Sequence, residues 1–169
     1  MSERYGDNTP VVKVELKRAD AYELVKSDKV LARCPVVTAL GAGLQAVLAK
    51  AIVRRYPDKV VIFQQGETGS GLYLVLAGEV RLFARKQADA VELGMVRKGD
   101  VLGEGEVLSG DAVRTSSAVA QGVVDLAELP REALLVNGKL THDLEQALKA
   151  IHQARAQALD EMTDFLNRW

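Results

Sequence analysis

The chain has few residues of the kinds that usually catalyse reactions or cross-link a fold. Of its 169 residues only Cys34 is a cysteine, so no intramolecular disulfide and no cysteine-based metal cluster can form. The two histidines, His142 and His152, lie near the C-terminus in an expected helix, and we predict both at the surface. A jelly-roll metalloenzyme needs histidine and carboxylate ligands on its strands, and a nucleophilic enzyme needs a base beside its nucleophile. The sequence therefore predicts a protein that is not an enzyme and holds no metal or cofactor.

An excess of one charge and a long apolar run are absent as well. Lysine and arginine number 22 against 23 aspartate and glutamate residues, a net charge of −1, which gives no support for binding nucleic acid or an anionic membrane. No apolar run approaches the roughly 20 residues that span a bilayer, and the polar N-terminus carries no secretory signal. We therefore expect a single-domain cytoplasmic protein with no nucleic acid and no membrane among its partners.

The pattern of apolar residues changes twice along the chain. Residues 1–11 are polar and predict a flexible N-terminal arm. Apolar residues then recur at helical spacing up to Pro35, which we expect to end the first helical run, and again after Gly41–Gly43. Between about 51 and 130, short apolar runs alternate with glycine-containing turns, at 52–53, 60–63, 72–76, 80–84, 91–93, 115–120 and 123–129. This close spacing predicts an eight-stranded antiparallel β-barrel or jelly roll with flanking helices.

The helical pattern returns after Pro130. Thr141 is a suitable N-cap, and no glycine or proline interrupts residues 139–169. Apolar side chains step by three or four residues along one predicted face: Leu144, Leu148, Ile151, Ala154, Ala158, Met162, Phe165 and Trp169. We therefore divide the chain into the arm at 1–11, a β-barrel domain with N-terminal helices at 12–137 and a long amphipathic helix at 138–169.

The stretch from Lys98 to Ser117 carries the chemistry. It holds four glycines, at positions 99, 103, 105 and 110, followed by Arg114 and three hydroxyl side chains. Glycine lets backbone N–H groups approach an anion closely, and a helix that starts near Glu104 directs its first N–H groups at that anion. Arg114 can add a charge-assisted hydrogen bond, and Thr115 can donate another. On these residues alone, a solvated turn followed by an arginine at a strand edge is the alternative.

This stretch resembles the phosphate-binding cassette of the cyclic-nucleotide-binding domain family, which begins Gly-Glu, continues with two apolar residues and closes with arginine and a small or hydroxyl residue. The matching residues here are Gly103-Glu104, Val107-Leu108 and Arg114-Thr115. Three further landmarks are similar to the family in order and spacing: Phe63–Glu67, Leu72–Val80 and Lys98–Asp100. The resemblance covers about residues 30–137 and implies a β-barrel sensor like those of catabolite activators and protein kinase regulatory subunits.

Carried over position by position, the resemblance implies a ligand-binding set of Gly103, Glu104, Gly105, Glu106, Val107, Arg114 and Thr115. In that set Glu104 accepts the ribose 2′-hydroxyl and Arg114 neutralises the cyclic phosphate. Backbone N–H groups from Gly105 to Val107 complete the cradle, and Thr115 contacts the phosphate or the purine. Apolar side chains of the barrel interior either receive the ribose and base or serve only as core: Val75, Leu82 and Val101. The implied ligand is cyclic AMP, favoured over cyclic GMP.

Glu106 departs from the family pattern. After its Gly-Glu the family has a large apolar residue and then a small one, where this chain has Gly105 and Glu106. A second carboxylate ~4–6 Å from the phosphate repels it by about 3–4 kcal/mol at an effective dielectric of ~20, unless it points into solvent. An alternative register takes Gly105-Glu106 as the functional pair. The second hypothesis is a degenerate domain that serves as a dimerisation or docking scaffold without ligand, and Glu106 in the anion's place would favour it.

The expected function is that of a regulatory module. It binds a cyclic nucleotide and passes the signal through its C-terminal helix to an effector protein that the sequence does not identify. The segment after the barrel has no room for a winged DNA-reading unit, so nucleic acid is not an expected partner. The apolar stripe of the helix also leaves open a homodimer through that helix.

Overall fold

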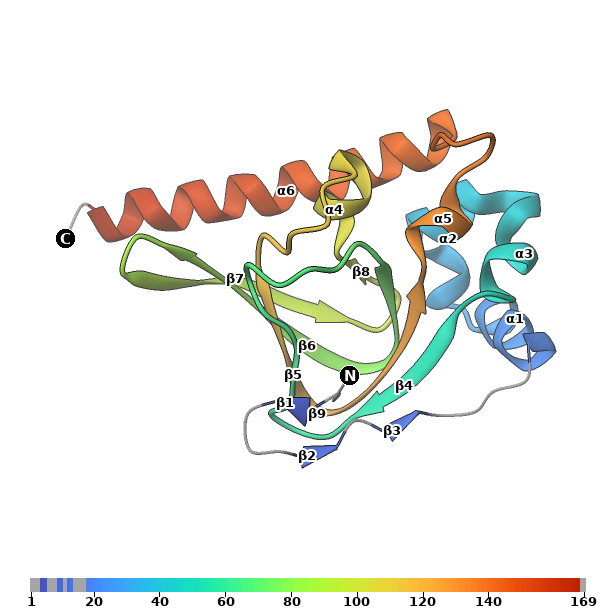
Figure 1. Cartoon of the computed structure of the whole chain (residues 1–169), viewed down its shortest axis with the longest axis horizontal. Coiled ribbons are helices and arrows are strands. Elements are labelled where there is room, and N and C mark those ends of the chain that lie inside the picture. Colours follow the sequence, from blue (N-terminus) through green and yellow to red (C-terminus); the bar gives the residue numbers. More distant parts are fainter. Residues whose placement is uncertain (1–3, 6–8, 11, 14–17, 168–169) are drawn as a thin grey trace.

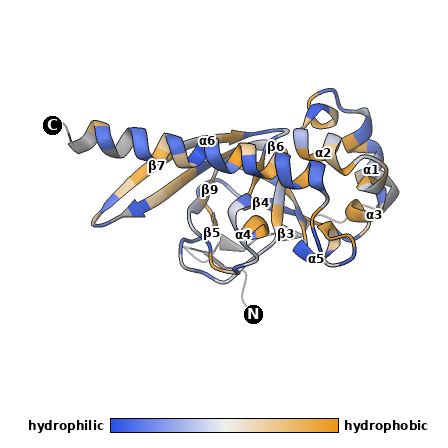
Figure 2. Cartoon of the chain, turned by 90° about the horizontal axis from the view of Figure 1, so that it is seen from above, coloured by the Kyte–Doolittle hydropathy of each residue, from blue (hydrophilic) through white to orange (hydrophobic). Residues whose placement is uncertain are grey.

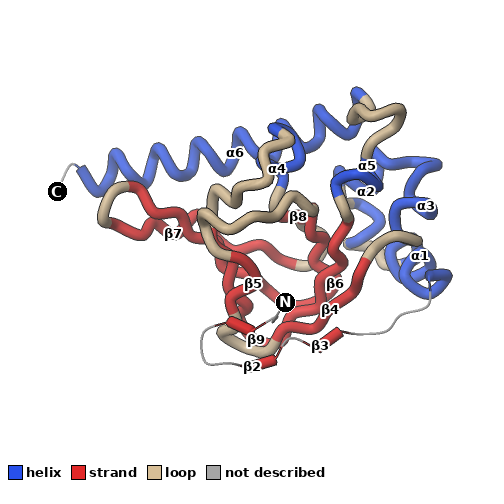
Figure 3. Tube along the Cα trace, in the orientation of Figure 1, coloured by secondary structure: helices blue, strands red, loops and turns tan. Residues whose placement is uncertain are grey.

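A strongly curved antiparallel sheet forms the centre of the molecule, with helices packed at one end and one long helix lying across it (Figure 1, Figure 3). The structure is a computed structural model that describes residues 4–5, 9–10, 12–13 and 18–167. The predicted flexible arm at 1–11 lies mostly outside these residues; its described parts, β1 (Arg4–Tyr5) and β2 (Thr9–Pro10), pair with each other. The domain boundaries drawn from the sequence stay a prediction.

The sheet contains six strands between residues 52 and 129, with β3 added at one edge. In chain order the strands are β3 (Val12–Lys13), β4 (Ile52–Tyr56), β5 (Val61–Phe63), β6 (Leu72–Lys86), β7 (Asp89–Arg97), β8 (Val101–Leu102) and β9 (Ser117–Leu129). Their order across the sheet is β3-β4-β9-β6-β7, with β5 paired to β9 and β8 paired to β6. The jelly-roll class is therefore confirmed, but the eight-stranded closed barrel is corrected to an open sheet, because β3 and β7 do not pair with each other.

Two predicted pairs of short strands are single long strands that bend. The expected turn at Ala77-Gly78 is a bulge inside β6, where the register with β9 shifts on both sides of Ala77. Gly78 has φ 91°, and a Cβ there would lie 2.4 Å from the carbonyl oxygen of Val123, so glycine is required where β6 comes this close to β9. A bulge bends a strand without ending it, which lets β6 and β9 serve both halves of the jelly roll.

The helices follow the predicted segments with one correction. They are α1 (Arg18–Ser27), α2 (Pro35–Leu40), α3 (Leu44–Leu48), α4 (Glu104–Ser109), α5 (Arg131–Leu134) and α6 (His142–Asn167), with 3₁₀ turns η1 (Leu31–Arg33) and η2 (Gly41–Gly43). Pro35 begins α2 instead of ending a helical run, since the first turn of a helix does not need the N–H that proline lacks. The run breaks earlier, at Asp28, whose carboxylate accepts hydrogen bonds from the N–H groups of Val30 and Leu31.

The long helix α6 runs along the molecule, packs against α4 and lies beside the β6–β7 hairpin (Figures 1 and 2). Thr141 caps it as predicted, accepting a hydrogen bond at Oγ1 from the N–H of Leu144. Leu144 and Leu148 are fully buried against α2 and the end of the sheet. None of the helices in the described part of the chain is long and apolar enough to cross a membrane.

Candidate functional site

Arg114 is held by a short ladder between two loops. Its N–H donates to the carbonyl of Glu67 (2.8 Å), and its own carbonyl accepts from the N–H of Gly66 (2.8 Å). One residue away, Thr68 and Val113 form an isolated bridge. The loop at 64–71 thus fixes the backbone of the arginine, which is why the glycine-rich turn after β5 belongs to the site although it lies far away in sequence.

The guanidinium of Arg114 points inward, and the residue is 3% exposed. It lies over the ring of Phe63 at 4.4 Å and near that of Tyr73 at 5.4 Å, contacts that favour a desolvated cation. Burial, followed by the nearby carboxylate of Glu128, raises the pKa of Tyr73 far above its usual range, so this ring stays neutral. Nη1 donates to the carbonyl of Gly71 (3.1 Å). Nε is buried and has no hydrogen-bond partner among the described residues.

Two glycines make room for this side chain. A Cβ at Gly69 would lie 2.9 Å from Nε, and a Cβ at Gly103 would lie 2.7 Å from Nη1. Gly103 also has φ 88° at the start of α4, a left-handed conformation that glycine adopts without strain. Gly103, which the sequence linked to close approach of an anion, therefore also allows close approach of the guanidinium.

Glu106 lies beside this guanidinium and is 3% exposed. One carboxylate oxygen accepts from the N–H of Thr115 (2.7 Å) and from its hydroxyl (3.3 Å), and the other lies 3.5 Å from Nη1 of Arg114. We call the space between these donors the anion position. Glu106 therefore neither points into solvent nor stands unpaired: its carboxylate contacts Thr115 and Arg114, the two residues that the resemblance assigned to the phosphate.

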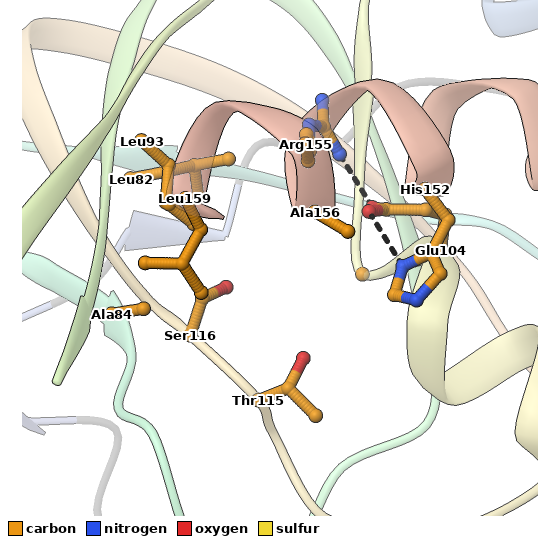
Figure 4. Close-up of a pocket in the computed structure, with 11 residues that line it drawn as sticks. Leu82, Ala84, Leu93, Glu104, Thr115, Ser116, His152, Arg155, Ala156 and Leu159 are labelled. Atoms are coloured by element: carbon orange, nitrogen blue, oxygen red, sulfur yellow. Dashed lines mark hydrogen bonds and ion pairs between the residues drawn. The ribbon is translucent and has the colours of Figure 1, made fainter. Parts of the chain in front are cut away.

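Glu104 turns the other way, toward α6. Its carboxylate forms an ion pair with Arg155, which also donates to the carbonyl of Val101, and it lies 3.6 Å from Nδ1 of His152 (Figure 4). The side chain of Glu104 is 8% exposed and that of Arg155 is 20% exposed. The two carboxylates of the cassette thus have separate partners. The partners of Glu106 lie within the β domain, and those of Glu104 lie on α6.

A cavity of about 150 Å³ lies between the cassette, the sheet and α6. Apolar groups from the sheet and α6 line the cavity together with polar groups from the cassette and α6 (Figure 4): Leu82, Ala84, Leu93, Ala156 and Leu159, with Gly103, Glu104, Thr115, Ser116, His152 and Arg155. Cavities that hold drug-sized ligands measure roughly 300–1,000 Å³. The volume of the cavity lies below this range, and residues of α6 form part of its wall.

Both histidines are exposed, as predicted, but His152 lies beside the site. A Cβ on Gly105 would come 3.1 Å from Cε1 of His152. The glycine that replaces the family's large apolar residue thus gives α6 room to approach α4. Sequence reasoning missed both His152 and Arg155 as site residues, although a single arginine between Ile151 and Leu159 on the inner face of the helix was a usable signal.

The predicted ligand set divides in space. Gly103, Glu104 and Thr115 line the cavity, whereas Glu106 and Arg114 lie behind it. Val107 is fully buried in the core beneath α4. Of the three interior residues, Leu82 lines the cavity, and the other two are buried in the core clusters: Val75 and Val101. Glu104, not Glu106, faces the cavity, which favours the Gly103-Glu104 register.

Residues 53–136 match the family model of the cyclic nucleotide-binding domain. The chain belongs to the cyclic-nucleotide-binding domain family. This domain family is regulatory and binds ligands. The match begins in β4, contains the whole cassette with Arg114, and ends just after α5.

Similar proteins agree with this assignment. The chain is 34% identical over 116 residues to a cyclic AMP receptor protein of Thermus thermophilus, covering 68% of this chain and 53% of that protein. It is 32% identical over 104 residues to a cAMP-dependent protein kinase regulatory subunit of Pyricularia oryzae, covering 61% of this chain and 26% of that protein. The crystal structure of the Thermus thermophilus catabolite activator protein superposes with a TM-score of 0.53 at 29% identity, covering 79% and 58% of the two chains. The chain thus spans a quarter to a half of the length of these two curated relatives.

Proposed function

We propose that this cyclic-nucleotide-binding domain is a non-catalytic regulatory module that binds cyclic AMP in preference to cyclic GMP and signals through α6 to an effector protein. The preference for cyclic AMP rests on the names of the similar proteins, a cyclic AMP receptor protein and a cAMP-dependent kinase regulatory subunit. The ligand would bind in the cavity, with its ribose near Glu104 and its phosphate near Arg114. The cytoplasmic location expected from the sequence stays a prediction.

The observation that carries this proposal is that the buried guanidinium of Arg114 has an unpaired hydrogen-bond donor and only a long contact to its counterion. A guanidinium has five N–H donors, and here Nε is buried without a partner among the described residues. The contact to Glu106 is 3.5 Å long, whereas charge-assisted N–H···O bonds are usually about 2.7–2.9 Å. A buried cation with an unpaired donor and a loose counterion retains capacity for an anion that binds it more closely.

The binding experiment is titration calorimetry of the chain with cyclic AMP, cyclic GMP and 5′-AMP. We expect cyclic AMP to bind more tightly than the other two. Replacing Arg114 by alanine should weaken the binding at least tenfold, because about 1.5–3 kcal/mol of charged hydrogen bonding is lost. An affinity for cyclic AMP that is equal in the wild type and the Arg114→Ala variant would show that Arg114 does not bind the phosphate. Heat changes of zero with both cyclic nucleotides at millimolar concentration would reject the ligand.

The route of the signal depends on the pair between Glu104 and Arg155. Because the cavity is small and α6 forms part of its wall, we expect a bound ligand to shift the helix and to compete with Arg155 for Glu104. Hydrogen exchange of α6 should rise on addition of cyclic AMP and should already be raised in the Arg155→Ala variant. Lys149→Ala, which removes an exposed cation from the same helix, is the control and should leave exchange beyond residue 150 unchanged.

The position of Glu106 favours a second candidate, a ligand-free scaffold. A carboxylate that fills the anion position satisfies Thr115 and neutralises Arg114 without any nucleotide. In that case the chain would act by dimerisation or docking, through α6 or another face. Calorimetry separates the two candidates, and sedimentation at several protein concentrations tests whether a dimer forms without ligand.

A further inference from the structure

Glu106 uses the donors that a bound phosphate would use. The N–H and the hydroxyl of Thr115 and Nη1 of Arg114 converge on its two carboxylate oxygens at 2.7, 3.3 and 3.5 Å. The side chains of Glu106 and Arg114 are 3% and 2% exposed, so both charged groups are shielded from bulk solvent. The carboxylate therefore imitates a bound anion in charge, in place and in hydrogen bonding.

We propose that Glu106 is a built-in anion that occupies the phosphate position of its own domain and must be displaced before an external anion can bind there. This inference rests on the proposed function only in naming a cyclic phosphate as the displacing ligand. The occupancy itself is a property of the chain. Glu106 and a phosphate would therefore compete for the same hydrogen-bond donors, those of Thr115 and Arg114, instead of only repelling each other.

The surroundings of Glu106 support exchange. The longest of its three contacts is the one to the cation, and Nε of Arg114 has no partner among the described residues. The strongest contact, to the N–H of Thr115, comes from the residue that also lines the cavity. An anion that enters from the cavity thus meets Thr115 first and can replace the carboxylate from that side.

The first experiment uses small anions and needs no nucleotide. Thermal unfolding of Glu106→Ala and of the wild type is followed in sodium acetate, sodium phosphate and sodium chloride at equal ionic strength. We expect acetate and phosphate to raise the melting temperature of Glu106→Ala more than that of the wild type, because an anion fills the vacated position. The difference should vanish in the double variant Glu106→Ala/Arg114→Ala. Asp125→Ala, which removes a carboxylate from an Arg–Asp pair on the sheet, controls for general salt effects.

The second experiment measures affinity for cyclic AMP in the wild type, Glu106→Ala and Glu106→Gln. Glutamine keeps the size of the side chain and removes its charge, so it serves if alanine does not fold. We expect both variants to bind cyclic AMP at least tenfold more tightly than the wild type. That factor corresponds to about 1.4 kcal/mol.

The outcomes separate this inference from the proposed function. Small-anion stabilisation without cyclic AMP binding in any variant supports the built-in anion and rejects the nucleotide. Cyclic AMP binding that is equal in all three proteins, with no selective anion effect, overturns the built-in anion and leaves the nucleotide site standing. Neither an anion effect nor cyclic AMP binding rejects both.

Discussion

The buried pair of Glu106 and Arg114 makes a quantitative prediction about stability. At 3.5 Å and an effective dielectric of ~20, two unit charges attract by about 4–5 kcal/mol. Removing one member of a buried pair costs roughly 3–5 kcal/mol, because the other charge stays desolvated and unpaired. Since the contact is long and the guanidinium keeps its bond to Gly71, we expect a coupling energy somewhat below the Coulomb value, about 2–3 kcal/mol.

The measurement is a double-mutant cycle with Glu106→Gln and Arg114→Met. Glutamine keeps the size of glutamate, removes its charge and can still accept from Thr115, and methionine keeps the apolar stem of arginine without its guanidinium. The free energy of unfolding is obtained from urea denaturation of the four proteins, and the double variant should lose less stability than the sum of the losses of the two single variants.

The control is the same cycle on the pair of Arg55 and Asp125, in which the side chains are 53% and 22% exposed. Solvent screens exposed pairs, so its coupling should be clearly smaller. A coupling below about 0.5 kcal/mol for Glu106 and Arg114 would show that the two charges do not interact in solution. Glu106 would then not act as the counterion of Arg114, and the built-in anion would be rejected.

Three further predictions concern the loops and the helical end of the domain. Gly69→Ala should destabilise the fold by about 1–3 kcal/mol in urea denaturation, because its Cβ would press on the buried guanidinium, whereas Gly43→Ala, with open space around it, should not. Burial raises the pKa of the Cys34 thiol, so the native protein at pH 8 should react with a maleimide much more slowly than the urea-unfolded chain; equal rates would contradict burial. The hydrogen bond from Lys98 lowers the pKa of Asp28, so the contribution of this pair is present above the unfolded pKa of about 3.9 and is lost as the pH falls further. The melting temperatures of the wild type and Lys98→Met should therefore differ at pH 6 and converge below about pH 3; a constant difference would contradict the pairing.

Much of the fold was accessible from the sequence because local signals dominate there. Apolar runs separated by glycines predicted the strands, and Thr141 predicted the start of α6. The sequence predictions were wrong at residues whose type is common in two different structural settings. Gly78 serves a bulge within a strand as well as it serves a turn, and Pro35 begins a helix as readily as it ends one. Neither choice is decided by neighbouring residues alone, since it depends on which strand or helix packs against the segment.

The sequence indicated which residues form the cassette but not which way its two carboxylates point. Glycine, carboxylate and arginine in this order pointed to an anion site, and Arg114 does turn inward. The direction of each carboxylate was out of reach, because Glu104 and Glu106 start from the same helical turn and their partners come from different parts of the chain. The partner of Glu104 lies on α6, where the apolar stripe carries alanines at 154 and 158. Alanine buries little area, so the inner face past Ile151 is weakly defined by hydrophobicity, and Arg155 and Leu159 take it instead.

The two ion pairs of the cassette divide the regulation of the proposed site into separate parts. The pair of Glu106 and Arg114 is internal to the domain, so its strength sets how much of the protein can accept a phosphate, and apparent affinity falls by that fraction. The pair of Glu104 and Arg155 joins the cassette to α6, so breaking it changes the freedom of the helix. A variant at Glu106 should thus shift the concentration at which ligand acts, while a variant at Arg155 should release the helix before ligand is added. If the Glu106 variants raised the hydrogen exchange of α6 as strongly as Arg155→Ala without ligand, the two pairs would be one unit and this division would be wrong.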